Sequence, residues 1–111
     1  MRLVGGGSRC AGRVEVKHQE EWRQLYSWSY WSMKHVAVVC RQLDCGSAVS
    51  TREYDGDEDR PVWWFDSDCT GTESDLRECG DVKRGPNSSY VIEVICSGNT
   101  HNVVTFTWGS W

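Results

Sequence analysis

The six cysteines of this chain constrain its fold more than any other feature. They are Cys10, Cys40, Cys45, Cys69, Cys79 and Cys96. An even number of cysteines in a chain of 111 residues is typical of a disulfide framework formed in an oxidising compartment. Structural zinc is the alternative, and it usually takes two closely spaced pairs of cysteines. Because Cys40 and Cys45 form the one close pair in the sequence, disulfides are favoured over a metal.

The charge and hydropathy of the chain exclude two classes of partner. Its 16 acidic and 12 basic residues give a net charge of −4, and no basic run is present to neutralise nucleic-acid phosphates. No apolar run approaches the roughly 20 residues of a membrane-spanning helix, so this segment is not expected to insert into a membrane. A chain of this length forms one domain, whose stability from burial alone is marginal.

The first quarter of the chain predicts three strands. Residues 2–6 read as a short strand. In residues 12–18, Val14 and Val16 alternate with charged neighbours, which is the period of a half-buried strand. Residues 21–28 are expected to form its hairpin partner.

One helix is predicted after Ser32. Its apolar positions stand at i, i+3, i+4 and i+7, and they are Val36, Val39, Cys40 and Leu43. Ser32 is a suitable N-cap and Gly46 a suitable stop. Cys40 and Cys45 would point about 140° apart around the helix axis, so the two are expected to have different partners.

The rest of the chain predicts a loop, two strands and a short helical turn. Residues 50–60 are highly charged and are expected to form a loop, and residues 61–65 read as a strand opened by a proline. Residues 72–80 predict a helical turn capped by Ser74, and residues 90–96 form the strongest strand pattern in the chain.

Five stretches of the sequence together resemble the scavenger receptor cysteine-rich (SRCR) domain. They are RLVGGGSRCAGRVEV, VAVVCRQLDCGSA, PVWW, CTGTESDLREC and VIC, and the second is the most distinctive. The resemblance covers residues 2–97. It implies an α+β fold in which a curved β-sheet cradles one main α-helix, in a secreted protein or the ectodomain of a membrane protein. Residues 98–111 are expected to be a tail: a linker, an extra strand or residues foreign to the natural protein.

The resemblance also implies how the cysteines pair. The fuller family pattern has eight cysteines, and this chain lacks the second and the seventh, which pair with each other in the family. The second falls at Tyr26 and the seventh near Pro86. The expected disulfides are therefore Cys10–Cys45, Cys40–Cys96 and Cys69–Cys79, with no thiol left over.

Four large aromatic residues crowd the stretch LYSWSYWSMK, where the second family cysteine would stand. They are Tyr26, Trp28, Tyr30 and Trp31. Trp31 matches a structural tryptophan of the family and is expected in the core. The other three have two interpretations: they fill the volume that the missing disulfide leaves, or they face solvent and bind a partner. Trp28 is the residue most expected to be exposed.

The acidic residues that hold calcium in cation-dependent SRCR domains are replaced here. Ser27 and Trp28 stand in place of an acidic pair, Ser89 and Tyr90 in place of glutamates, and Phe65 in place of a further acidic residue. Calcium takes six to eight oxygen ligands, several of them carboxylate, so neither a metal site nor a cofactor is predicted.

A second calcium pattern is incomplete. Asp55, Asp57 and Asp59 have the spacing of positions 1, 3 and 5 of an EF-hand loop, but position 6 is Arg60 rather than glycine and position 12 is Asp66 rather than glutamate. A solvated acidic loop is expected instead, and its functional interpretation is contact with a basic partner.

Two further motifs bear on modification and catalysis. Asn87-Ser88-Ser89 is an N-glycosylation sequon, and Asn87 is expected to be exposed. The histidines at positions 18, 35 and 101 are scattered, and oxidised cysteines supply no nucleophile, so no enzyme is predicted.

These observations predict a non-catalytic extracellular recognition module that binds a protein partner without calcium. It is expected to stand beside other domains in a larger protein. The candidate ligand-binding residues are three aromatic anchors and an acidic rim: Tyr26, Trp28 and Tyr30, with Asp55, Asp57 and Glu58. One alternative is a scavenger domain that binds polyanionic microbial or lipid surfaces. Another is a structural or accessory domain of a multidomain protein.

Overall fold

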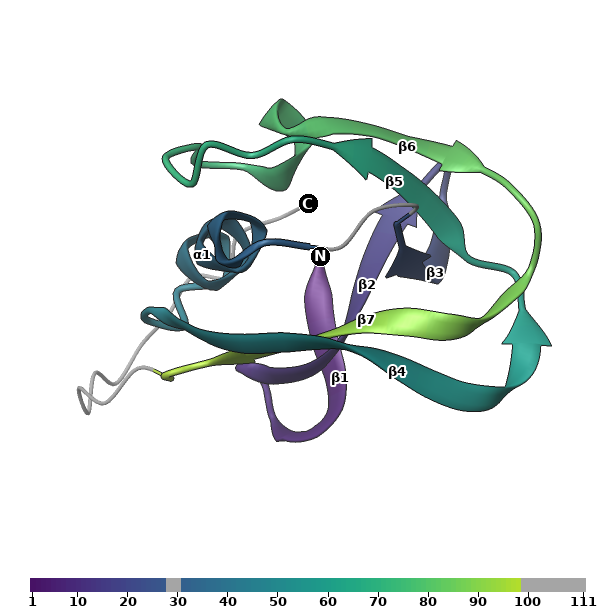
Figure 1. The fold of residues 1–111 in the computed structure, drawn as a ribbon, viewed down its shortest axis with the longest axis horizontal. Helices are drawn as coiled ribbons and strands as arrows, with labels where there is room; N and C mark the ends of the chain where they lie inside the picture. Colours follow the sequence, from purple (N-terminus) through teal and green to yellow (C-terminus); the bar gives the residue numbers. More distant parts are fainter. Residues whose placement is uncertain (28–30, 99–111) are drawn as a thin grey trace.

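The computed structural model of the protein describes residues 1–27 and 31–98, which form seven strands and one α-helix (Figure 1). In chain order the elements are β1 (Arg2–Ser8), β2 (Ala11–His18), β3 (Glu21–Tyr26), α1 (Met33–Gln42), β4 (Ala48–Arg60), β5 (Trp63–Ser67), the 3-10 turn η1 (Leu76–Glu78), β6 (Gly80–Arg84) and β7 (Ser88–Cys96). The predicted tail lies, apart from residue 98, outside the described residues.

The strands form one strongly curved sheet. Its order is β4-β7-β2-β3-β5-β6, with β1 paired to β2. Within the described residues β3 and β5 pair in parallel, and the other pairs are antiparallel. Figure 1 shows α1 at one end of the curve, between the β5–β6 layer and the β4–β7 layer. The fold is therefore α+β, with a curved sheet that cradles one helix, as the resemblance implied.

The core lies between α1 and the concave side of this sheet. Strand β2 buries alternate residues, β3 buries Leu25, and β5 buries three residues in a row. The fully buried large side chains of these strands are Val14, Val16, Leu25, Trp63 and Phe65. The helix contributes the apolar face that its sequence predicted, with Val36, Val39 and Cys40 fully buried. Trp31 is also buried in the core, so that prediction is confirmed.

Local hydrogen bonds fix both ends of α1. Ser32 is the N-cap, as predicted, and its side chain accepts a hydrogen bond from the backbone N–H of Lys34 at 3.2 Å. The helix ends at Gln42, earlier than the predicted stop at Gly46. Asp44 turns the chain with a left-handed φ of 56°, and the Arg9 guanidinium donates to the carbonyl oxygens of Leu43 and Asp44.

All three predicted disulfides are present. Cys10 pairs with Cys45, Cys40 with Cys96 and Cys69 with Cys79, and all six cysteines lie within the described residues. The first two join α1 and the turn after it to the ends of β7 and of the β1–β2 hairpin. On the chain-entropy model each closure stabilises the fold by roughly 2–4 kcal/mol.

The prediction of a loop at residues 50–60 was wrong, because these residues belong to β4. The backbone of β4 pairs along β7, with Thr51 opposite Val94 and Glu53 opposite Ile92. Since β4 lies at one end of the strand order, its charged side chains can remain in water while its backbone pairs. Charge here indicated solvent exposure rather than missing secondary structure.

The structure also bears on the incomplete EF-hand pattern and on the predicted cap of the short helical turn. Asp55 and Asp57 lie in β4 at a register shift, where Asp57 has a φ of 70°, so the residues form no EF-hand loop between helices. Asp75, rather than the predicted Ser74, caps the turn η1, because the Asp75 carboxylate accepts the backbone N–H of Arg77 at 2.8 Å. The hydroxyl of Ser74 instead donates to Glu78.

Aromatic packing connects the two positions where the missing family disulfide would lie. The ring of Tyr26 meets Trp64 edge-to-face, with the ring centroids 5.2 Å apart. The indole N–H of Trp64 donates to the carbonyl oxygen of Pro86 at 2.8 Å. Gly85 fits tightly against the same indole, since a Cβ there would lie 2.3 Å from a ring carbon. Trp64 thus holds together the segments around Tyr26 and Pro86 without a covalent bond.

Replacing Trp64 by alanine tests this substitute for the disulfide. Trp64→Ala removes both the ring contact with Tyr26 and the hydrogen bond to Pro86, and we expect it to lower the free energy of unfolding by about 3–5 kcal/mol. Urea unfolding measures the change. Tyr90→Ala is the matched control, because Tyr90 is 45% exposed, and its cost should stay within about 0.5 kcal/mol. Equal losses in the two variants would contradict the role of Trp64.

Candidate functional site

A surface groove of about 420 Å³ lies over β2, β3 and the outer parts of β4 and β7. Its walls carry aromatic, cationic and acidic side chains together. The lining residues that matter below are Arg13, Glu15, Trp22, Tyr54, Glu58 and Arg60.

The aromatic rings of the groove are stacked against arginines. The guanidinium of Arg2 lies 4.1 Å from the ring centroid of Trp22, which is 39% exposed. Arg13 lies over Tyr54 at 4.9 Å, and Arg52 lies near the same ring at 5.8 Å. Contacts of this kind contribute about 0.5–1 kcal/mol each at exposed sites. They hold large flat side chains in fixed positions at the surface.

The charges in and around the groove have both signs. The Arg2 guanidinium pairs with Glu15 at 2.7 Å, and the Glu58 carboxylate pairs with Arg60 at 3.6 Å. Arg13 is half-buried and forms no ion pair with any carboxylate of the described residues. The groove therefore offers one arginine that has no carboxylate at ion-pair distance among the described residues.

A second, smaller hollow of about 70 Å³ lies beside Tyr26. It is lined by Tyr26, Ser27, Trp31, Thr51, Arg52, Glu53 and Ile92. The Tyr26 hydroxyl donates to a carboxylate oxygen of Glu53 at 2.7 Å, which ties β3 to β4. Tyr26 is half-buried, so it packs against the fold while its polar end stays near the surface.

The structure separates the residues predicted to bind a ligand. Glu58 lines the large groove, whereas Tyr26 lines the small hollow. Asp55 and Asp57 are exposed on β4 and line neither. Trp28 and Tyr30 lie outside the described residues, so their placement stays a prediction. The acidic rim lies on β4 and Tyr26 lies on β3, and the two do not line one cavity.

Sequence reasoning missed Trp22, Tyr54 and Arg13. Trp22 could have been found from strand parity. Leu25 faces the core, and a residue three positions away on the same strand faces the opposite side of the sheet. Tyr54 was missed because its segment was taken for a loop.

The positions that carry calcium ligands in related domains do not fit calcium here. Ser27 and Phe65 are buried, and Ser89 and Tyr90 lie in β7 without carboxylates. None of these four described side chains supplies the charged oxygens that calcium prefers.

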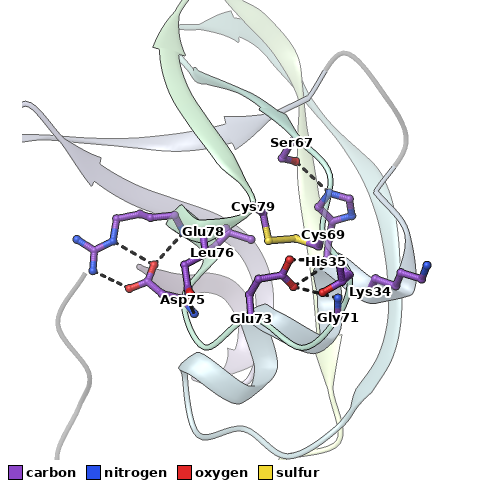
Figure 2. The surroundings of a disulfide bond; sticks show 12 residues. Lys34, His35, Ser67, Cys69, Gly71, Glu73, Asp75, Leu76, Glu78 and Cys79 are labelled. Carbon is purple, nitrogen blue, oxygen red and sulfur yellow. Dashed lines mark hydrogen bonds and ion pairs between the residues drawn. A yellow bond between two sulfur atoms is a disulfide. The ribbon is translucent and has the colours of Figure 1, made fainter.

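A cluster of polar and sulfur-bearing residues lies elsewhere, at the start of α1 (Figure 2). Buried His35 contacts the Ser67 hydroxyl through Nε2 at 2.9 Å, and its Nδ1 lies 3.3 Å from the backbone nitrogen of Ser32. Its ring stacks on Trp31 at 5.1 Å. An Nδ1 that accepts the Ser32 N–H completes a capping box, so His35 holds the start of the helix against β5.

Figure 2 also shows Glu73 beside the Cys69–Cys79 disulfide. The Glu73 carboxylate accepts the backbone N–H groups of Thr70 and Gly71, and these bonds lower its pKa to about 2. Ligand atoms of Cys69, Glu73 and Cys79 lie within 4.8 Å of one another, but both sulfurs are bonded in the disulfide. The cluster is a rigid loop support and offers neither a thiolate nucleophile nor a thiolate metal ligand.

Known proteins share this sequence pattern and this fold. A family model described as the scavenger receptor cysteine-rich domain matches residues 4–105. The chain belongs to the SRCR family. The third SRCR domain of murine neurotrypsin has a solved structure that superposes with a TM-score of 0.67 at 31% identity, over 86% of this chain and 94% of that one.

Two curated relatives are named as an antigen or as antigen-like. The chain is 38% identical over 91 residues to the human CD5 antigen-like protein. The aligned region covers 79% of this chain and 26% of that protein. It is also 38% identical over 81 residues to the mouse T-cell differentiation antigen CD6, over 71% of this chain and 12% of that protein. The chain thus spans about a quarter or less of these relatives, which are larger proteins with further segments.

Membership of the family settles two properties of the chain. This SRCR domain is an extracellular receptor module, and it is not an enzyme. Three closed disulfides agree with an oxidising compartment. Within residues 1–27 and 31–98, no helix is both long and apolar enough to cross a membrane.

Because His35 is buried, we expect the stability of the fold to decrease at acidic pH. Burial lowers the pKa of His35 below its ordinary value, so the unfolded chain takes up the proton at a higher pH than the folded one. The contribution of His35 to stability is therefore complete above about pH 6.5 and declines as the pH falls below it. Protonation would also turn Nδ1 from an acceptor into a donor and break the capping box.

His35→Gln isolates this effect, because glutamine can complete the capping box and does not titrate. We expect the Tm of the unmodified chain to fall between pH 7.5 and pH 5.5 by more than that of the variant, as followed by circular dichroism. Parallel decreases in both proteins would show that other groups cause the acid sensitivity.

Proposed function

We propose that this SRCR domain binds a protein partner, without calcium, through the groove over β2, β3 and β4. The observation that carries the proposal is the pairing of Trp22 and Tyr54 with arginines at an accessible, preformed surface. Tryptophan, tyrosine and arginine are the residues most enriched in binding hot spots.

The rigidity of the surface supports this function. The Cys10–Cys45 disulfide fixes the hairpin that carries Arg13, and the Arg2–Glu15 ion pair holds the arginine that covers Trp22. Side chains that are already ordered lose little conformational entropy on binding. A partner that places a carboxylate beside Arg13 would compensate the charge that the fold leaves unpaired.

The acidic rim on β4 extends this surface. Asp55, Asp57 and Glu58 are exposed, and we propose that they meet basic side chains of the partner. Trp28 and Tyr30 are kept as proposed apolar anchors on the basis of the sequence, with Tyr26 as their support from β3.

Binding to polyanionic surfaces is the second candidate, and Arg13 is the observation that favours it. The other arginines of the groove have carboxylate neighbours: Arg60 pairs with Glu58 and Arg23 with Glu21. Because these carboxylates repel phosphates and sulfates, a single unpaired arginine is a weak site for a polyanion. A domain that only supports its neighbours in a larger protein would bind neither class of ligand.

Alanine variants distinguish these functions once the domain has been screened against an array of extracellular protein domains. For a partner that binds, we expect Trp22→Ala and Trp28→Ala each to weaken the affinity by about 2 kcal/mol or more, roughly 30-fold, because they remove anchors of the interface. Surface plasmon resonance measures the change.

Met33→Ala is the control, because Met33 is exposed on α1 and lines neither hollow. Unchanged affinity in Trp22→Ala, with the fold intact by circular dichroism, would refute the groove as the binding site. Binding of heparin or lipopolysaccharide in place of any protein would favour the second candidate.

The calcium independence of binding is tested separately. Titration calorimetry with calcium chloride should give no heat of binding at micromolar affinity, because the described positions of the family site lack carboxylates. Partner affinity should be the same in EDTA as in millimolar calcium. Micromolar calcium binding that Asp66→Asn or Asp68→Asn abolishes would contradict the proposal, since these are the acidic residues next to Phe65.

A further inference from the structure

The sequon Asn87-Ser88-Ser89 lies at the edge of the groove. Asn87 is exposed in the short turn between β6 and β7. Ser88 and Ser89, the next two residues, are part of the groove lining, and Ser88 is the register partner of Arg60 on β4. The side chain that would carry a glycan is thus one residue away from the wall of the groove.

The backbone before Asn87 is held in place. The Trp64 indole donates to the carbonyl oxygen of Pro86, and Gly85 packs against the same ring. On the other side, the Ser88 hydroxyl lies 2.9 Å from the carbonyl oxygen of Tyr90 and accepts the Tyr90 backbone N–H. A group attached to Asn87 would therefore start from a fixed point rather than from a mobile loop.

We propose that Asn87 carries an N-linked glycan whose first sugars lie over the Ser88–Arg60 end of the groove and restrict access to it. The modification itself requires only the sequon and the extracellular location. Its effect on access deepens the proposed function, because it matters for binding only if the groove is the docking surface. The glycosylated and unglycosylated domains would then accept different partners: large, flat ones are excluded by the glycan, whereas a narrow segment can still enter from the Trp22 end.

The glycan is transferred to Asn87 from a donor in which an oligosaccharide is linked to a polyprenyl diphosphate. The Asn87 side-chain nitrogen bonds to C1 of the first N-acetylglucosamine, the bond from C1 to the diphosphate oxygen breaks, and the polyprenyl diphosphate leaves. The amide nitrogen loses one proton, which the departing diphosphate takes up. Ser89 supplies the hydroxyl that the sequon requires two positions after the asparagine.

Intact mass spectrometry of the domain secreted from cultured animal cells tests the attachment. We expect a heterogeneous mass increase that peptide N-glycosidase removes, leaving aspartate at position 87. Asn87→Gln and Ser89→Ala should lack the increase, whereas Ser89→Thr, which keeps the sequon, should retain it. A secreted domain with the mass of the bare polypeptide would overturn the proposal.

Arginine labelling tests the position of the glycan without any partner. Phenylglyoxal modifies accessible guanidinium groups, and peptide mass spectrometry reports the rate at each arginine. We expect Arg60 to react severalfold more slowly in the glycosylated domain than after enzymatic removal or in Asn87→Gln, with Arg77 on η1 as an internal reference of constant rate. Equal rates at Arg60 in the two forms would show that the glycan leaves the groove open, whatever the outcome of the partner-binding experiments.

Discussion

The fold depends on the divergent cross-links at the end of α1. Cys40 joins the helix to the last residue of β7, and Cys45, just beyond the helix, joins the turn between β1 and β2. These bonds hold one helix against a sheet whose strands are far apart in the sequence. With the helix fixed, Val36 and Val39 can pack on Leu25 and the other buried side chains of the sheet without a large core. The rigid groove that we propose as a binding surface lies on the same sheet.

Aromatic contacts replace covalent ones at the other end of the molecule. Tyr26, Trp64 and the Pro86 carbonyl link two segments that related domains join by a disulfide. The packing of Tyr26 there supports the interpretation in which aromatics fill the vacated volume, at least for this residue. Trp64 also positions the turn that carries Asn87. One indole thus contributes to stability, to the shape of the groove edge and to the placement of the proposed glycosylation site.

The sequence allowed some parts of the fold to be predicted and hid others for physical reasons. The helix and its Ser32 cap were predictable, because a local apolar period and a local hydrogen bond define them. The disulfide pairs followed from family resemblance, since cysteine spacing alone leaves several pairings open. Strand β4 was missed because its exposed charges resemble those of a loop. The groove was missed because Trp22 and Tyr54 are 32 residues apart in the sequence. They lie on β3 and β4, which pair with β2 and β7 respectively, and no local pattern predicts that the two residues line one groove. Of the predicted ligand-binding residues that the structure describes, Glu58 alone lines it.

The uneven distribution of disulfides gives the domain two mechanically different ends. Every covalent clamp in the described residues lies close to α1 or its neighbouring loops, whereas the end around Trp64 is closed by dispersion forces and hydrogen bonds. Noncovalent closures open and reclose on short timescales, and covalent ones do not. Local opening is therefore expected first at the end around Trp64, whereas the end at α1 stays covalently closed.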